Sequence, residues 1–178
     1  MPRLAFRNAT LDDVDVIVAL VESAYRGDAS RQGWTTEADF LDGRRTDAAG
    51  VADLIVKPDS RVLLAEADER LLACAHVAKL DATGYFGMFS VVPHLQGSGV
   101  GRAMLAHAER VVRDTWQCVE MHMSVISIRD ELIAWYERRG YRRSGIHKPF
   151  PYGDERFGIP RRDDLRFEVL LKSLDASR

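Results

Sequence analysis

The fold is decided by the stretch FSVVPHLQGSGVGR, residues 89–102. An apolar, strand-like run ends at Pro93, because proline lacks the N–H that the interior of a strand needs. A glycine-rich turn follows and opens a predicted helix over 98–116. Glycine lets the backbone approach a ligand closely, and the unpaired amides of a helix N-terminus favour phosphate. With Arg102 adding a cation, the stretch predicts a site for a phosphate-bearing ligand.

Two common phosphate-binding motifs do not match this stretch. A Walker loop needs Gly-Lys-Ser/Thr, whereas Gly101 is followed by Arg102. A dinucleotide fingerprint needs Gly or Ala at its last position. Counted from Gly97 that position is Arg102, and counted from Gly99 it is Met104. An NTP-binding domain is therefore disfavoured, and a plain glycine turn before a helix remains the simpler alternative.

Hydrophobic periodicity outward from this stretch predicts a chain of strands and helices. The expected strands cover 4–8, 61–66, 71–80, 85–92, 119–126, 142–146 and 165–171. The expected helices cover 11–26, 36–41, 47–56, 98–116 and 130–139, with Thr10 capping the first and an exposed loop over 27–35. Short turns between strands indicate an antiparallel meander, and the helix over 98–116 is a crossover between two parallel strands. The predicted fold class is α/β, a mixed, mostly antiparallel sheet flanked by helices.

Length and composition are those of an ordinary globular chain. The 178 residues suit one domain over 1–178. The formal net charge of −2 argues against a nucleic-acid or anionic-membrane partner, and no apolar run approaches the roughly 18 residues of a membrane span. The N-terminus lacks an apolar signal segment, and Cys74 and Cys118 are interpreted as buried free thiols, so we expect a cytoplasmic protein. The histidines show no metal-ligand spacing, so no metal is expected.

Two motifs carry a resemblance to a known family. The run QGSGVG, residues 96–101, resembles the Gln/Arg-x-x-Gly-x-Gly/Ala signature of the GNAT acetyltransferase superfamily. The run AWYERRGY, residues 134–141, resembles the second motif of that family, and the predicted order of elements matches its fold along most of the chain. The resemblance implies central parallel strands that splay apart, pantetheine in the gap between them, and the coenzyme A pyrophosphate on the loop amides.

The resemblance also implies which residues contact coenzyme A. The expected contacts lie at the end of the strand and in the loop: Phe89, Ser90, Val91, Gly97, Ser98, Gly99, Val100, Gly101 and Arg102. Seven residues before the motif tyrosine, where the family often has a cofactor-binding Asn, this chain has Arg129. We expect Arg129 to be a further contact, through its side-chain donors. The alternative is that Arg129 is a surface arginine at the start of a helix.

The implied activity is transfer of an acetyl group from acetyl-CoA to a primary amine. No nucleophile motif is present, so the amine attacks directly in a ternary complex. A lysine-like amine with a pKa of about 10.4 is only about one part in 10³ neutral at pH 7, so its proton must be removed. Tyr136 matches the motif tyrosine and is the candidate acid for the departing thiolate. The alternative is that Tyr136 only packs beside Trp135 and Tyr141.

The candidate general base lies on the predicted strand over 119–126. Glu120, His122 and Ser124 alternate with apolar residues and share one face. Relatives with a catalytic Glu on this strand have it at the position of Ser124, which cannot serve as a base. Glu120 and His122 are therefore the candidates, acting directly or through water, and His122 begins nearer a useful pKa, at about 6.5. The alternative is a solvated strand face.

The acceptor remains open, as a small-molecule amine or a peptide amine. Recognition is expected from the loop after the first helix and from the C-terminal region. These segments hold Tyr25, Arg31, Trp34, Glu37 and Asp39, and Phe150, Tyr152, Asp154, Glu155, Arg156, Arg161 and Arg162. Acids and aromatics suit an ammonium group, arginines suit a carboxylate or phosphate, and the sequence does not choose between them. A homodimer also stays open, as does a second function, a non-catalytic acyl-CoA-binding or regulatory module.

Overall fold

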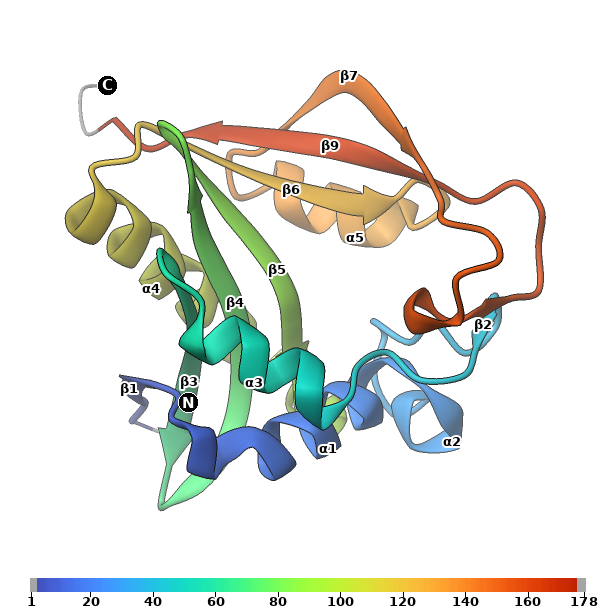
Figure 1. The fold of residues 1–178 in the computed structure, drawn as a ribbon, viewed down its shortest axis with the longest axis horizontal. Coiled ribbons are helices and arrows are strands. Elements are labelled where there is room, and N and C mark those ends of the chain that lie inside the picture. The colour runs from blue at the N-terminus through green and yellow to red at the C-terminus, as the bar shows by residue number, and fades with distance from the viewer. Residues whose placement is uncertain (1–2, 176–178) are drawn as a thin grey trace.

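The computed structural model describes residues 3–175 and is built around one seven-stranded sheet. The sheet has the order β1-β3-β4-β5-β6-β9-β7 (Figure 1). Its strands are β1 (Ala5–Asn8), β3 (Ser60–Ala67), β4 (Arg70–Leu80), β5 (Thr83–Val91), β6 (Glu120–Ile126), β7 (Arg142–Pro149) and β9 (Arg166–Ser173). Only β5 and β6 run parallel, while every other neighbouring pair is antiparallel. This confirms the predicted mixed, mostly antiparallel α/β fold.

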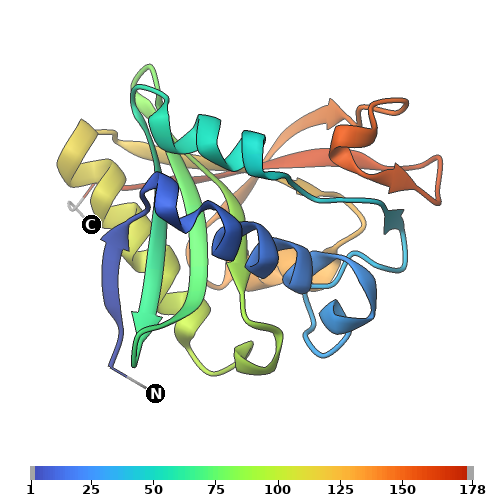
Figure 2. The ribbon, with the colours of Figure 1, turned by 60° about the horizontal axis from the view of Figure 1, so that its bottom comes forward.

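Helices cover both faces of the sheet. The helices are α1 (Val14–Tyr25), α2 (Gly27–Ser30), α3 (Ala48–Val56), α4 (Val100–Trp116) and α5 (Asp130–Glu137). Apolar side chains of α1 and α3, among them Ile17 and Val51, pack on one face of β3 and β4. Met104 of α4 and Ile133 of α5 belong to the core on the other face. Figure 2 shows α1 and α3 in front of the strands and α4 behind them.

The central strands β5 and β6 part soon after they begin to pair. They are in register at only three positions, Thr83–Glu120, Gly84–Met121 and Tyr85–His122. Beyond Tyr85 the two strands diverge, as Figure 1 shows. A register shift between β4 and β5 lies beside the divergence, at Cys74/His76, and Met88 there has a φ of 47°. A bulge of this kind bends its strand, and it explains how β5 leaves β6. The expected splay is confirmed.

Most predicted elements appear within three residues of their expected bounds, but the segment between α1 and α3 differs. The helix predicted over 36–41 is wrong, because a single turn at Glu37 is followed by β2 (Leu41–Asp42), which pairs with β8 (Ile159–Pro160). The stretch 27–35 is not a plain exposed loop, because it contains α2 and buries Ser30. Contacts with residues distant in sequence determine the structure of this segment, and local hydrophobic periodicity carries no information about such contacts.

The start of the first helix also differs from the prediction. Thr10 precedes a short 3-10 turn over Leu11–Asp13, and α1 begins only at Val14. The Thr10 N–H donates to the Asp13 carboxylate at 2.8 Å, so Thr10 does begin the helical segment. Leu11, which the prediction places inside the helix, is 55% exposed, because it lies in the 3-10 turn and not on the buried face of α1.

Candidate functional site

Two pockets adjoin at the place where β5 leaves β6. The first pocket, about 350 Å³, lies between the glycine loop and α5. The second pocket, about 320 Å³, lies between the C-terminal parts of β5 and β6 and reaches α1. Phe89 of β5 and Leu132 of α5 line both pockets. The gap in the sheet is therefore the boundary between two sites, one on each side.

The first pocket is bounded on one side by the glycine loop and the start of α4. Gly99 has a φ of 95° directly before the helix, a conformation that suits glycine. Within residues 3–175, no backbone acceptor pairs with the N–H groups of Val100, Gly101 and Arg102. Together with the positive end of the helix dipole, these amides make a site for an anion.

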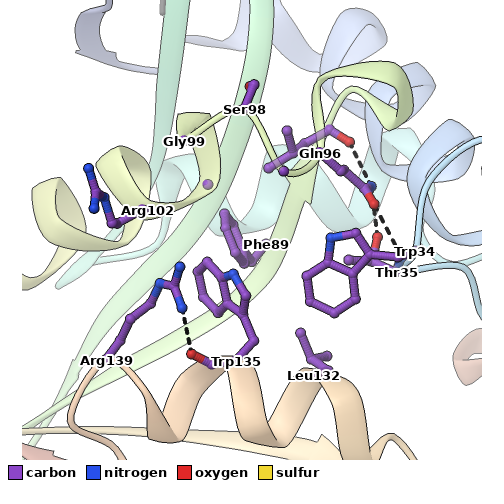
Figure 3. Close-up of a pocket in the computed structure, with 13 residues that line it drawn as sticks. Trp34, Thr35, Phe89, Gln96, Ser98, Gly99, Arg102, Leu132, Trp135 and Arg139 are labelled. Atoms are coloured by element: carbon purple, nitrogen blue, oxygen red, sulfur yellow. Dashed lines mark hydrogen bonds between the residues drawn. The ribbon is translucent and has the colours of Figure 1, made fainter.

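The opposite wall of the first pocket supplies a second cation. The Arg139 guanidinium stacks 3.6 Å from the centre of the Trp135 ring and donates to the Trp135 carbonyl at 2.8 Å. Its Nε atom is buried without an acceptor in the described part of the chain. Burial and the charges of Arg138 and Arg102 lower the pKa of Arg139. Figure 3 shows Arg139 reaching from the end of α5 toward the glycine loop. A ligand with phosphate charges fits between these donors.

Gln96, the first residue of the glycine motif, fixes the loop in place. Its Oε1 accepts from the Thr35 N–H at 3.2 Å, and its Nε2 donates to Thr35 Oγ1 at 2.8 Å and to the Val91 carbonyl at 3.2 Å. Figure 3 shows the two bonds to Thr35 as dashed lines beside Trp34. Trp34, expected on the acceptor side, instead lines the first pocket.

The structure brings most of the expected coenzyme A contacts together. Seven of them line the first pocket: Phe89, Val91, Gly97, Ser98, Gly99, Gly101 and Arg102. The Val100 side chain is fully buried in the core, so only its N–H can face a ligand. Ser90 is buried, donates to the Met88 carbonyl at 3.4 Å and lines neither pocket. Arg129 lines the second pocket rather than the first.

Three tyrosines from different layers meet at the second pocket. Tyr25 comes from α1, Tyr85 from β5 and Tyr136 from α5. They can meet because the sheet is open there, and the Tyr25 hydroxyl donates through it to the Phe89 carbonyl. Tyr136 is 4% exposed, and burial together with Tyr25 raises its pKa above the ordinary range, so its phenol stays protonated.

Tyr136 also packs as the sequence-based alternative expects. Its ring contacts Trp135 and Tyr141 edge to face, at centroid distances of 5.1 and 5.7 Å. Packing and pocket lining are compatible, because the two neighbours hold the ring while Tyr136 still lines the pocket. Its position is compatible with either role.

A buried ion-pair cluster forms one wall of the second pocket. Glu37 accepts from Arg129 Nη1 at 3.0 Å and also from Arg26 Nη1, and Arg129 donates further to the Thr35 carbonyl. Burial opposes ionisation of Glu37, but Arg129, Arg45 and Arg26 outweigh it and lower its pKa. Arg129 is thus committed to Glu37 and Thr35. Sequence reasoning named Glu37 and Arg129 separately and missed their pairing, because they are 92 residues apart.

Glu120 and His122 lie at the paired end of β5 and β6, away from the gap. Neither residue lines either pocket, whereas Ser124 on the same strand lines the second. The His122 ring lies edge to face with Tyr85 at 5.7 Å, and Tyr85 does line the second pocket. Burial and Lys148 lower the pKa of His122, with Glu120 acting in the opposite direction. Tyr85 therefore links His122, but not Glu120, to the second pocket.

The remaining acceptor candidates divide between the pocket and the surface. Tyr25, Glu37 and Phe150 line the second pocket. The others for which ion pairs are formed sit at the surface, in the pairs Arg31–Asp39, Arg156–Asp154, Arg161–Asp42 and Arg162–Asp164. The β2–β8 pairing and the Arg161–Asp42 ion pair together form what we term the clasp. The clasp holds the segment carrying Phe157, which lines the second pocket.

Residues 3–175 contain no group of three or more His, Cys, Asp or Glu placed to hold a metal ion. Among the helices of the described chain, none combines the length and the apolar character that crossing a membrane requires. Cys74 and Cys118 are free and buried, as predicted.

The sequence matches the family model of the acetyltransferase (GNAT) family over residues 20–141. That range contains the glycine loop, both central strands and α5. A comparison with curated proteins finds no match.

Solved structures share the fold at low sequence identity. The ribosomal-protein-S18-alanine N-acetyltransferase of Escherichia coli has a TM-score of 0.72 and 12% identity, covering 99% of this chain and 97% of that one. An N-acetyltransferase of Staphylococcus aureus Mu50 has a TM-score of 0.73 and 13% identity, and the match covers 97% of this chain and 98% of that one. The spermidine/spermine N-acetyltransferase of Vibrio cholerae has a TM-score of 0.67 and 13% identity, and the match covers 97% of this chain and 93% of that one.

Proposed function

The chain belongs to the GNAT acetyltransferase family, and from this we propose that it transfers an acetyl group from acetyl-CoA to a primary amine. One observation carries the proposal. An anion-binding loop and a pocket holding a protonated tyrosine lie on either side of the gap between β5 and β6, and they adjoin at Phe89.

The first pocket fits coenzyme A. The free N–H groups at the start of α4 would hold the pyrophosphate, with Arg102 and Arg139 neutralising its charge. The buried, unpartnered Nε of Arg139 supports this, because a charged donor gains from an anionic acceptor. The apolar surfaces of Phe89 and Trp135 would line the path of the pantetheine arm toward the gap.

The second pocket fits the transfer step. The amine nitrogen attacks the thioester carbonyl carbon, so that a C–N bond forms and the C–S bond breaks. Tyr136 donates its phenol proton to the leaving sulfur, and its raised pKa keeps that proton in place at neutral pH. The attacking nitrogen loses two protons in all: one leaves the ammonium group before attack, and the second leaves the tetrahedral intermediate and restores the Tyr136 phenol. Glu120 and His122 stay the proposed bases, acting through water, and the contact between His122 and Tyr85 connects His122 to the second pocket. General acid–base catalysis of this kind raises the reaction rate roughly 10²–10⁴-fold.

Direct attack is favoured over an acetyl-enzyme. Burial raises the pKa of the Cys74 thiol to about 12, which suppresses the nucleophilic thiolate. Among the described residues neither cysteine lines either pocket. Two adjoining pockets allow both substrates to be bound together, so we propose a ternary complex.

The proposal is tested by the release of coenzyme A from acetyl-CoA, with and without amines. The panel comprises amino acids, polyamines, aminoglycosides and peptide N-termini. We expect acceleration by a primary amine and intersecting double-reciprocal plots, with no acetylated enzyme in intact-mass spectra. Tight acetyl-CoA binding with slow hydrolysis that no amine accelerates would instead indicate the non-catalytic acyl-CoA-binding module.

A further inference from the structure

The second pocket carries more positive charge than the proposed reaction requires. Its lining contains three guanidinium groups, those of Arg26, Arg45 and Arg129, and in the described chain one carboxylate, that of Glu37. Both Glu37 oxygens are engaged, Oε1 by Arg129 at 3.0 Å and Oε2 by Arg26. Glu37 is thus committed to arginines and is not free to bind a substrate ammonium. The wall keeps a net positive charge.

Arg26 has donors that the protein does not satisfy. Its side chain is 5% exposed, and its Nε and Nη2 atoms meet no acceptor within residues 3–175. A buried charged donor without an acceptor loses its hydration and gains no replacement. An anionic oxygen brought by a ligand would satisfy it.

Arg45 adds a guanidinium that has no ion-pair partner among the described residues. Its backbone N–H is fixed by Glu22 Oε1 at 2.7 Å, and its guanidinium lies 5.7 Å from the centre of the Tyr25 ring. No carboxylate of the described residues forms an ion pair with it, while its charge reaches Glu37 and Tyr25. The Arg129 guanidinium lies at the same distance, 5.7 Å, from the Tyr25 ring, so Arg45 and Arg129 both lie against one tyrosine of the pocket.

The rest of the second pocket is largely apolar. Phe86, Met123, Phe150 and Phe167 are among its lining side chains, and they suit an apolar body. Positive surroundings also lower the pKa of a bound amine. They therefore favour the neutral, reactive form of a single amine and disfavour polyamines, which bring several positive charges.

We propose that the acceptor is an amine that carries a carboxylate on an apolar body, as the apolar amino acids do, with Arg26 and Arg45 binding the carboxylate. This inference rests on the proposed function, since it assigns the substrate class of the same reaction. The positive charge of the wall favours an acceptor with a carboxylate, and the apolar lining favours an acceptor with an apolar side chain.

The kinetic test compares acceptors that differ only in the carboxylate. L-phenylalanine and L-leucine are set against their amides, with phenethylamine and spermidine added, and kcat/KM is expressed per neutral amine. We expect each acid to exceed its amide by roughly 10- to 100-fold, the scale of a charged hydrogen-bonded contact. Arg45→Gln should bring the acid-to-amide ratio close to one. Arg44→Gln, which alters the neighbouring exposed arginine outside both pockets, should keep the ratio.

A binding measurement separates this inference from the proposed function. L-phenylalanine and its amide are titrated calorimetrically into the CoA-saturated protein, which needs no turnover. Tighter binding of the acid without acetyl transfer supports the carboxylate site and overturns the proposed function. Acetyl transfer in which the amides, phenethylamine or spermidine match or exceed the acids overturns this inference and supports the function. Equal binding of acid and amide without transfer overturns both.

Discussion

The two pockets that meet at Phe89 are built in different ways. The first presents main-chain N–H groups from one short segment, the start of α4, and its glycines keep the approach open. The second is assembled from side chains as far apart in sequence as Tyr25 and Phe167. A site made of main-chain groups from one segment can be predicted from a local sequence motif. A site made of side chains from distant segments forms only when the chain folds. The two pockets should therefore respond differently to mutation.

The largest effect is expected at the backbone site. In Gly101→Val the new Cβ would lie 3.2 Å from Phe89 Cζ, and its methyl groups would enter the first pocket. We expect coenzyme A binding to be lost while the fold persists, because Val is tolerated in a helix. Calorimetric titration with CoA and circular dichroism measure the two properties. Ala49→Val, which places a valine at an exposed position of α3 outside both pockets, controls for the general effect of valine in a helix. Unchanged CoA affinity in folded Gly101→Val contradicts the assignment of the first pocket.

At the second pocket, we expect a mutation that breaks the buried ion-pair cluster to lower the free energy of unfolding of the protein. Glu37→Gln leaves buried guanidinium groups without their carboxylate, and removing one partner of a buried pair costs about 3–5 kcal/mol. The pKa of Glu37 is lowered by folding, so its contribution is present above its unfolded pKa of about 4.3. It is lost as the pH falls through the lower folded value.

Urea denaturation at several pH values measures the effect of Glu37→Gln. We expect a lower free energy of unfolding at pH 7 and a weaker loss of stability on acidification than in the wild type. Asp39→Asn is the matched control, because the Asp39–Arg31 pair is exposed and contributes under about 1 kcal/mol. Equal stability of the two variants would mean that the buried cluster does not hold the second pocket together.

Tyr136→Phe tests chemistry at the second pocket without disturbing its packing. Phenylalanine keeps the ring contacts with Trp135 and Tyr141 and removes only the hydroxyl. We expect kcat to fall roughly 10²-fold, with acetyl-CoA affinity unchanged, because the proton is donated in the transition state. Tyr141→Phe, whose hydroxyl bonds Glu109 outside both pockets, should retain kcat. Normal turnover of Tyr136→Phe would show that Tyr136 only packs.

The smallest effect is expected for His122, which lies outside both pockets. A base is active when neutral, so the rate should rise with pH through its pKa. Burial and Lys148 lower that pKa, which places the limb below about pH 6.5. We expect His122→Ala to lower kcat less than Tyr136→Phe does and to alter only this acid limb. Glu120→Gln tests the other candidate in the same way. Wild-type pH profiles in both variants would mean that the amine loses its proton to bulk water.

The sequence predicted the central fold because its signals there are local. Pro93 and the glycines that follow mark a strand end and a helix start, and they do so within one segment. The crossover helix that follows makes β5 and β6 parallel, as expected from chain connectivity alone. The splay itself came from the family resemblance, since a bulge at Met88 leaves no clear periodic signal.

The sequence could not predict the contacts that cross between distant segments. Glu37 lies in a stretch predicted to be helical, but its buried partners are Arg26 and Arg129, and their pairing follows from the fold. Arg139 stood inside a recognised motif without being singled out, because nothing in its spacing indicates that it stacks on Trp135 at the first pocket. The charge balance of the second pocket is likewise visible only in three dimensions.

The clasp gives the covering of the second pocket a mechanical weakness. It consists of a ladder of only two residue pairs, Leu41–Pro160 and Asp42–Ile159, and the exposed Arg161–Asp42 ion pair. Opening it breaks far fewer contacts than separating strands of the main sheet, so this segment should fluctuate open while the rest stays folded. Salt screens exposed ion pairs. Ionic strength therefore controls how fast molecules enter and leave the second pocket. Amide hydrogen exchange at Arg161, whose N–H donates to the Phe40 carbonyl at 2.9 Å, would report each opening.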